Sequence, residues 1–342
     1  MFSDLLGISG TNSHLQQWEY PPAVCGQHTN TESLHRSKKW CMTAYRIWEA
    51  IAQDPNLAKD AEMQMRKSVF FFPNKPEHNT KQRFKLSEIY RSGIKGARRD
   101  SSLIQGMGVN LESGAVDAYE LLVPVIDTDV SMKWLIDLVL RKGGKLVTDK
   151  INGDLLAQER TLIMRFNSDS IVNATGLASK ELTSDSTCYP LRGALLRFIN
   201  DGQDFPKITA AMSIAADASL DNEIVFLVPR NDNILVVGGI AQREEWDLDL
   251  TLDSPIIQRM RARCEDFLPC LKNARLDSEY PLAQGLRPGR EANIRVERET
   301  RNHDTHPSRI VHSYGHGGSG WSLSFGCAEE VAGMVEDMLR ND

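Results

Sequence analysis

The sequence lacks the features that would place it in several special classes of protein. None of its apolar runs approaches the roughly 20 residues that a membrane-spanning helix needs. Its six cysteines are scattered, without a CxxC pair or a Cys/His cluster, which argues against a zinc site and a disulfide scaffold. Its net charge of −6 implies no broad basic surface. We therefore expect no metal site, no membrane span and no nucleic-acid partner.

Neither end of the sequence carries a recognisable targeting signal. The start, MFSDLLGISGTNSH, has no basic segment followed by an apolar core, so it is not a secretory signal. The final residues, MLRND, do not match a peroxisomal tripeptide of the SKL type. We expect a cytoplasmic protein, with the peroxisome as the alternative location.

The composition is that of a globular protein, with 41% hydrophobic and 25% charged residues in 342. Apolar periodicity predicts helices over residues 37–52, 130–142, 255–267 and 322–339. It predicts strands over residues 69–72, 145–147, 162–166, 170–173, 224–228, 234–239, 293–299 and 309–313. The turn residues PRNDN between 224–228 and 234–239 predict that these two strands form a hairpin. Helices and strands alternate at both ends while strands dominate the middle, so we expect an α/β domain interrupted by a sheet-rich one.

The most informative segment is IVHSYGHGGSGWSLSFGCA, residues 310–328. An apolar run enters it, a helical pattern leaves it, and Gly315, Gly317, Gly318 and Gly320 lie between. Such a turn lets backbone N–H groups approach a ligand, and the helix dipole favours an electron-rich one. A flexible loop is an equally good interpretation of these residues alone.

Two further segments and one basic stretch are weaker signals. A short strand runs into the small-residue turn at Thr175 and Gly176, as happens where a sheet edge meets a cofactor. Arg287 lies in the rigid context QGLRPGR, which is able to orient a guanidinium, although a surface or interface ion pair is the commoner role. The basic residues 91–99 indicate a solvated loop rather than an anion site.

Five motifs together resemble the D-amino-acid oxidase family. VNATG, YPLRG, VVGGIAQREEW, GLRPGR and the glycine-rich segment occur in that family's order and rough spacing. The last segment departs from the family signature only at Ser313, where Asn, His or Ala is usual. The resemblance extends from about Pro21 to the C-terminus.

This resemblance implies an α/β fold in which a Rossmann-like FAD-binding domain carries an inserted, sheet-rich α+β substrate domain. The expected FAD-binding domain comprises residues 1–61, 125–187 and 285–342, and it is incomplete at the N-terminus. The expected substrate domain comprises residues 62–124 and 188–284. A homodimer is left open.

The implied activity is oxidative deamination of a D-amino acid by FAD and dioxygen, giving a 2-oxo acid, ammonia and hydrogen peroxide. By matching motifs, Arg287 resembles the arginine that pairs with the substrate carboxylate, and Gly318 the residue whose carbonyl accepts from the amine. The residues that resemble the cofactor-binding set are Thr175, Gly176, Gly317, Gly318, Gly320, Trp321 and Ser322. In this family the flavin does the chemistry, so no catalytic acid or base is expected. Ala241 in GGIAQ supplies no cation, which favours a neutral substrate.

Two departures from the family bear on activity. Phe226 stands where the family usually has a tyrosine that bonds the carboxylate, and loss of that hydroxyl costs about 1–2 kcal/mol. Only 19 residues precede Tyr20, and they contain LLGISGTNSH instead of a GxGxxG turn, so the phosphate cradle is expected to be missing.

Three explanations for the missing cradle remain open. In the first, the chain is a shortened product that binds FAD weakly or not at all. In the second, residues 1–19 or 25–36 form a substitute cradle. In the third, the fold is kept as a flavin-poor module that binds a small carboxylate or a protein.

Overall fold

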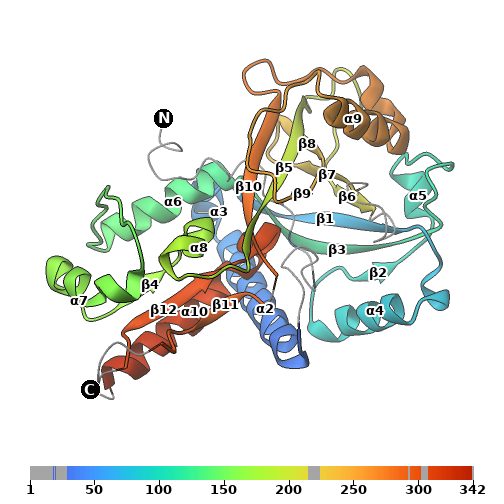
Figure 1. Ribbon diagram of the computed structural model, residues 1–342. Helices are drawn as coiled ribbons and strands as arrows, with labels where there is room; N and C mark the ends of the chain where they lie inside the picture. The colour runs from blue at the N-terminus through green and yellow to red at the C-terminus, as the bar shows by residue number, and fades with distance from the viewer. Residues whose placement is uncertain are drawn as a thin grey trace. The chain divides into compact units, whose positions relative to one another are not determined.

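The computed structural model describes residues 18, 20, 29–214, 224–291, 293–301 and 307–340 (Figure 1). The described chain is a mixed α/β protein that divides into two compact units, each made of separate pieces of sequence. The first unit includes Trp48–Lys145 and Arg192–Leu286, and the second includes Tyr20–Ile47, Leu146–Leu191 and Arg287–Asp342. The proposal that one unit binds the cofactor and the other the substrate stays a prediction.

A nine-stranded sheet forms most of the first unit, in the order β10-β5-β8-β7-β6-β1-β3-β2, with β9 paired to β5. The start of β5 (residues 188–191) and the end of β10 (residues 287–290) belong to the second unit. Its strands are β1 (Met63–Phe72), β2 (Arg98–Arg99), β3 (Asp117–Ile126), β5 (Cys188–Ile199), β6 (Ala211–Ile214), β7 (Val225–Pro229), β8 (Ile234–Gly238), β9 (Gln242–Arg243) and β10 (Leu282–Arg290). Its helices are α3 (Pro55–Asp60), α4 (Thr80–Ser92), α5 (Leu103–Gly106), α6 (Thr128–Arg141) and α9 (Pro255–Phe267).

The core of this unit lies between the sheet and α9. The predicted hairpin is confirmed, because β7 and β8 pair antiparallel, from Phe226 opposite Gly238 to Pro229 opposite Leu235. Helix α9 packs on both strands and turns Met260 and Cys264 into the core, where neither is exposed. Each fully buried large side chain of this kind contributes about 1.5–3 kcal/mol, so the hairpin and helix stabilise one another.

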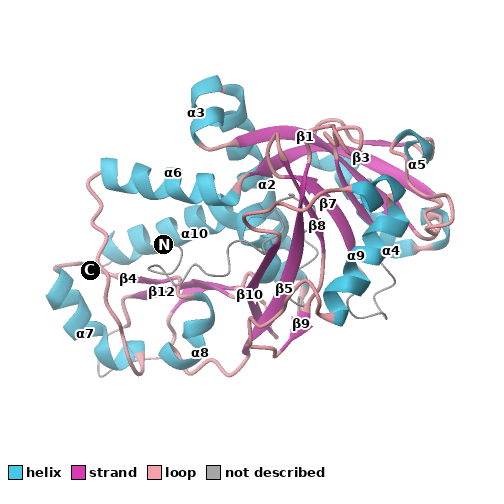
Figure 2. Cartoon of the chain, turned by 90° about the horizontal axis from the view of Figure 1, so that it is seen from above, coloured by secondary structure: helices cyan, strands magenta, loops and turns pink. Residues whose placement is uncertain are grey.

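A three-stranded sheet forms the second unit, in the order β11-β12-β4. Its strands are β4 (Ile171–Asn173), β11 (Arg295–Arg298) and β12 (Ile310–Tyr314), and its helices are α7 (Leu155–Phe166), α8 (Ser179–Leu182) and α10 (Gly320–Arg340). Strands β12 and β4 run parallel, whereas β11 pairs antiparallel to β12. Figure 2 shows α10 on one side of β4 and β12, and α7 and α8 on the other.

Two of the predicted strands are wrong. Residues 162–166 belong to α7, because Asp154 caps the helix by accepting from the N–H groups of Leu156 and Ala157, and Asn167 ends it in the left-handed conformation at φ 48°. The buried leucines of this helix follow a helical spacing that starts at Leu155. Residues 145–147 are irregular and exposed.

Helix α2 (Thr31–Gln53) begins six residues before its predicted start. Asn30 explains the early start, since its Oδ1 accepts from the N–H of Ser33 at 2.8 Å. Within the second unit α2 lies close against α10. A Cβ on Gly326 would lie 2.2 Å from the Cα of Trp40, so only glycine permits this approach.

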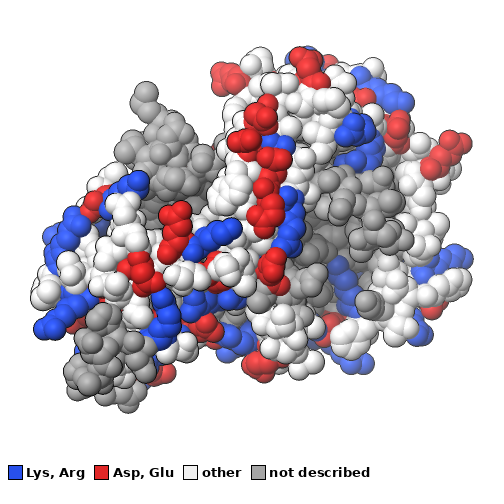
Figure 3. All heavy atoms as spheres, in the orientation of Figure 1, with Lys and Arg blue, Asp and Glu red and all other residues white. Residues whose placement is uncertain are grey.

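The basic stretch at residues 91–99 is not wholly a solvated loop. Arg98 and Arg99 form strand β2 beside β3, and Arg99 pairs with Asp117 and Glu77. On the face drawn in Figure 3, acidic and basic side chains are interspersed.

Candidate functional site

Two of the predicted site segments meet at one edge of the small sheet. In the parallel pair β4 and β12, Asn173 lies opposite His312. The Thr175–Gly176 turn follows the carboxyl end of β4, and the glycine-rich segment follows the carboxyl end of β12. Ligands of α/β proteins bind at this end of parallel strands, so the edge is a candidate ligand site.

The third segment, the end of β10, lies against both turns. A Cβ built on Gly176 would be 3.6 Å from the Cβ of Pro288, and one built on Gly315 would be 2.9 Å from the Cβ of Arg290. Arg287 precedes Pro288 directly. The fold therefore brings together three segments, the first and last of which are more than a hundred residues apart in the sequence.

The glycine-rich turn presents backbone rather than side chains. Gly315 and Gly317 have φ of +84° and +55°, which residues with a Cβ rarely adopt. A short 3-10 turn over Gly317–Ser319 leads into α10 at Gly320, and the first turn of that helix contains no acidic residue. A Cβ on Gly320 would meet no atom of the described residues within 4 Å, so these residues leave space beside the positive end of the helix dipole. This arrangement suits an electron-rich group.

Most residues of the glycine-rich turn are buried, which agrees with a turn that presents its backbone. Gly317 and Gly318 are buried, and Trp321 and Ser322 are only 8% and 6% exposed. These two side chains lie mostly in protein, so what they offer a ligand is chiefly their backbone.

The turn after β4 is held by its own side chains. The Oδ1 of Asn173 accepts from the N–H of Thr175 at 3.2 Å and from its hydroxyl at 2.7 Å. Gly176 follows at φ +58°. Thr175 itself is exposed, so this turn is both fixed in shape and open to a ligand.

Arg287 is buried, with 4% of its surface exposed. Burial lowers the pKa of its guanidinium to about 10, which leaves it charged at neutral pH. A charge in such surroundings attracts a carboxylate more strongly than it would in water, because the local dielectric is lower.

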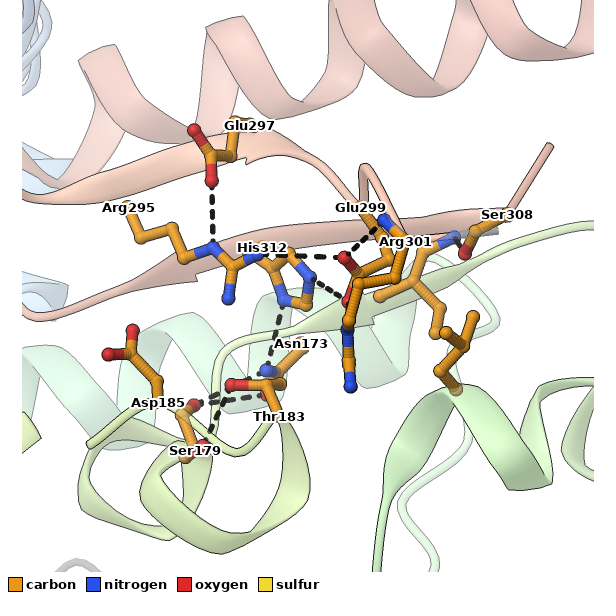
Figure 4. Close-up of polar contacts among 12 residues, drawn as sticks. Asn173, Ser179, Thr183, Asp185, Arg295, Glu297, Glu299, Arg301, Ser308 and His312 are labelled. Carbon is orange, nitrogen blue, oxygen red and sulfur yellow. Dashed lines mark hydrogen bonds and ion pairs between the residues drawn. The ribbon is translucent and has the colours of Figure 1, made fainter. Parts of the chain in front are cut away.

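A buried polar network lies directly beneath the two turns, and sequence reasoning missed it (Figure 4). His312 contacts the Nδ2 of Asn173 at 3.2 Å and the Oε2 of Glu299 at 3.3 Å. Burial, assisted by Arg295 and opposed by Glu299, lowers the pKa of His312 to about 4. The imidazole is therefore neutral, with Nε2–H donating to Glu299 and Nδ1 accepting from Asn173. Asn173 thus links His312 to Thr175.

A second part of the network centres on Tyr314, the last residue of β12. Its hydroxyl donates to Asp185 at 2.8 Å, accepts from Arg295 at 2.7 Å and lies 3.0 Å from the hydroxyl of Thr183. Burial raises the pKa of Tyr314 to about 12. A His and a Tyr at alternate positions of an otherwise apolar strand, HSY, were the available signal, since alternate residues share a face.

Phe226 is described within the first unit, where it is 3% exposed. It packs in an apolar cluster with Leu195, Val228 and Val236. A Cβ on Gly239 would lie 2.8 Å from the Phe226 ring, so the ring occupies the space above that glycine. Its predicted place at the substrate stays a prediction.

The candidate substitutes for a phosphate cradle fall mainly outside the described residues. Of the candidates at residues 1–19 and 25–36, residues 1–17, 19 and 25–28 lie outside the described part of the chain. In the described part, the N-terminus of α2 is capped by Asn30, whose side chain already engages the N–H of Ser33.

Among the described residues, no group of three or more His, Cys, Asp or Glu side chains could hold a metal ion. In the same part of the chain, no helix combines the length and the apolar character needed to cross a bilayer.

Comparison with known proteins gives consistent matches. Residues 7–334 match the DAO family, described as FAD dependent oxidoreductase. The chain is 28% identical over 304 residues to a D-amino-acid oxidase of Rubrobacter xylanophilus, covering 88% of this chain and 79% of that protein. It is 32% identical over 213 residues to a D-amino-acid oxidase of Streptomyces coelicolor, covering 62% and 58% respectively. The fold is similar to that of glycine oxidase from Bacillus cereus, with a TM-score of 0.66 at 14% identity, over 95% of this chain and 86% of that one.

Proposed function

This chain belongs to the family of FAD-dependent oxidoreductases, and from that premise we propose that it oxidises a neutral D-amino acid to the 2-oxo acid. The observation that carries the proposal is the meeting of the Thr175–Gly176 turn, the glycine-rich turn and the Arg287 strand at the carboxyl ends of β4 and β12. The D-amino-acid oxidases to which the chain is similar support the choice of substrate class.

The described residues fit FAD on the side of its ring system. The open space beside Gly320 and the left-handed glycines leave room for a flat group against the backbone. We assign the isoalloxazine contacts to Gly317, Gly318, Gly320, Trp321 and Ser322, with Thr175 and Gly176 on the neighbouring turn. FAD, when bound by these residues, would supply the two-electron acceptor, with dioxygen as the final oxidant and hydrogen peroxide as its product.

The protein's own residues bind and orient the substrate. Arg287 pairs with the carboxylate through its planar guanidinium, and the carbonyl of Gly318 accepts a hydrogen bond from the amine. These two contacts fix the carboxylate and the amine of the substrate, and selection of one face of its α-carbon requires a third contact, with the substrate side chain. Phe226 offers no hydroxyl to the carboxylate, so Arg287 carries more of the binding than a tyrosine-assisted arginine would.

The first test measures flavin and peroxide on the purified full-length chain. A visible flavin absorption band at about one FAD per chain, with peroxide released from neutral D-amino acids but not from their L-enantiomers, supports the proposal. A flavin band together with peroxide release from glycine, proline or L-amino acids instead would support the proposed oxidase activity but refute the proposed substrate class. The absence of a band after FAD addition would favour a module that binds a small carboxylate or a protein.

The second test replaces Arg287 by lysine. We expect the KM to rise at least tenfold, because an ammonium group does not reproduce the paired hydrogen bonds of a guanidinium. Arg309→Lys is the control, since Arg309 lies in the same unit and bonds the carbonyl of Asp169 at 3.1 Å. A KM unchanged in Arg287→Lys, with FAD still bound, would make Arg287 a structural residue.

A further inference from the structure

Asp185 lies where all three segments of the candidate site are joined. Its Oδ2 accepts from the hydroxyl of Tyr314 at 2.8 Å and from the Nε of Arg290 at 2.8 Å. Its Oδ1 accepts from the N–H of Thr187 at 3.1 Å, which fixes the carboxylate on its own loop. Tyr314 ends β12, Arg290 ends β10, and Asp185 itself lies twelve residues after the end of β4. One buried carboxylate therefore connects the chain segments that carry the predicted site.

The contact with Arg290 bears on the direction of Arg287. Successive side chains of a strand point to opposite faces, so Arg287 and Arg290, three positions apart, leave β10 on opposite sides. Arg290 is held at two points, by Asp185 and by the carbonyl of Asn293. Pro288 lies between the two arginines and restricts the backbone there. The contacts that fix Arg290 therefore also fix the rotation of the strand about its axis, and with it the face on which the Arg287 side chain lies.

The contact with Tyr314 bears on the glycine-rich turn. Tyr314 is 1% exposed and directly precedes Gly315, where the chain leaves the sheet. Its hydroxyl is engaged by Asp185, Arg295 and Thr183, so the start of the turn is anchored from three directions. The stem of Arg290 also packs on Gly315. Figure 4 shows Asp185 and Thr183 grouped on the segment that follows β4, opposite Arg295.

We propose that Asp185 is a positioning residue, which through Arg290 and Tyr314 aims Arg287 at the substrate and holds the glycine-rich turn in the shape that receives FAD. The identity of these two ligands rests on the proposed function. Asp185 touches neither ligand in this proposal. It acts by fixing three segments relative to one another. Two of them contain turns rich in glycine and other small residues, which have few side chains of their own to hold their shape.

The experiment compares two variants with a matched control. Asp185→Asn keeps the size of the side chain and removes its charge, and Tyr314→Phe removes one hydroxyl oxygen. The control is Glu159→Gln, because Glu159 accepts from Ser308 and Arg309 at the opposite, amino-terminal end of β12. Three measurements are made: hydrogen exchange of the amides of residues 175–178 and 315–322 without FAD, FAD affinity by titration, and KM against kcat.

We expect exchange in both turns to accelerate about tenfold in Asp185→Asn and FAD to bind about tenfold more weakly, with smaller changes of both in Tyr314→Phe. The KM should rise more than kcat falls, since Arg287 loses its aim while the chemistry stays with the cofactor. Glu159→Gln should change none of these by more than about twofold.

The proposal is overturned if exchange in the two turns is the same in the variants and the control. If Asp185→Asn does not fold, Tyr314→Phe decides alone, because it deletes a single atom. Failure of the proposed function is recognised separately. If the wild-type chain oxidises no amino acid, hydrogen exchange and FAD titration still test the role of Asp185. If it binds no FAD, hydrogen exchange alone still tests that role.

Discussion

Each of the two units contains a buried aspartate that is paired with an arginine, and the two clusters connect different kinds of chain segment. In the first unit Arg230 pairs with Asp127 at 2.7 Å and with Asp129, and Asn231 bonds Asp127 at 3.0 Å. This cluster connects the end of β7 to the first turn of α6, where Asp127 is the N-cap. In the second unit the Asp185 cluster connects three segments that all carry predicted site residues.

The chemistry of the two clusters is nearly the same. Burial would raise the pKa of both aspartates, but hydrogen bonds from Arg230 lower that of Asp127, and those from Thr187, Arg290 and Tyr314 hold that of Asp185 well below its usual range. What differs is the backbone beside the partners. One cluster connects the end of a strand to the first turn of a helix, and the other connects strand ends that adjoin glycine residues. A polar cluster of the second kind therefore governs the shape of a site as well as stability.

Removing the carboxylate from the first cluster gives the largest expected effect on stability. Asp127→Ala should lower the free energy of unfolding by about 3–5 kcal/mol, because Arg230 would be left buried without its main partner. Urea unfolding measures this loss. FAD affinity of the folded variant should equal that of the wild type. A parallel loss of FAD affinity as large as in Asp185→Asn would erase the distinction between the clusters.

The second-largest expected effect is a loss of stability on acidification, which should arise in the second unit and not in the first. The pKa of His312 is about 4 in the folded chain and about 6.5 when unfolded, so the unfolded chain takes up a proton first as pH falls. The stability that neutral His312 contributes is complete above pH 6.5 and is lost as the pH falls towards 4. Between pH 7 and pH 5 this loss is about 2 kcal/mol. The Asp127 carboxylate, whose pKa is already lowered, keeps its charge over this range.

Urea unfolding of the FAD-free protein at the two pH values measures this loss. His312→Asn should flatten the pH dependence, although it costs some stability at pH 7 through lost hydrogen bonds. His35→Asn, a change at an exposed position of α2, is the control. An equally steep loss in His312→Asn would assign the pH dependence to other groups.

Much of this fold was predictable from local patterns. The helix over residues 255–267 and the hairpin of β7 and β8 are confirmed, because period and turn residues specify them locally. The strand expected at 162–166 was wrong because its short apolar run belongs to a helix whose cap, Asp154, lies eight residues earlier. The ten-residue pairing of β1 with β3 was not predicted, since contacts of that sequence separation leave no local signal.

The candidate site was likewise only partly predictable from the sequence. Glycines and a Pro-flanked arginine are visible as motifs, so Arg287 and the residues of both turns could be named from the sequence. Asp185 occurs in SDST, which indicates nothing beyond a turn. Its role depends on Arg290 and Tyr314, more than a hundred positions away, which only the fold brings to it.

The smallest expected effect on stability comes from Gly320, at the start of α10. A Cβ there meets no atom of the described residues within 4 Å, and the residue has helical φ and ψ of −51° and −45°, so Gly320→Ala clashes with none of them. Alanine also restricts the unfolded chain more than glycine does. The free energy of unfolding should therefore stay unchanged or rise by up to about 1 kcal/mol.

The same methyl group should nevertheless weaken FAD binding, because it fills the open space beside the helix N-terminus that we assign to the cofactor. We expect about a tenfold loss of affinity in a titration, a change of about 1.4 kcal/mol. Gly333→Ala is the matched control, since Gly333 lies later in α10 and a Cβ there also meets nothing within 4 Å. Gly333→Ala gains at least as much helix propensity as Gly320→Ala, because it lies in the interior of the helix, so a loss of FAD affinity in Gly320→Ala alone reports on the cofactor. Equal FAD affinity in the two variants would place the ring system away from Gly320, and the contacts assigned to Trp321 and Ser322 would then fall with it.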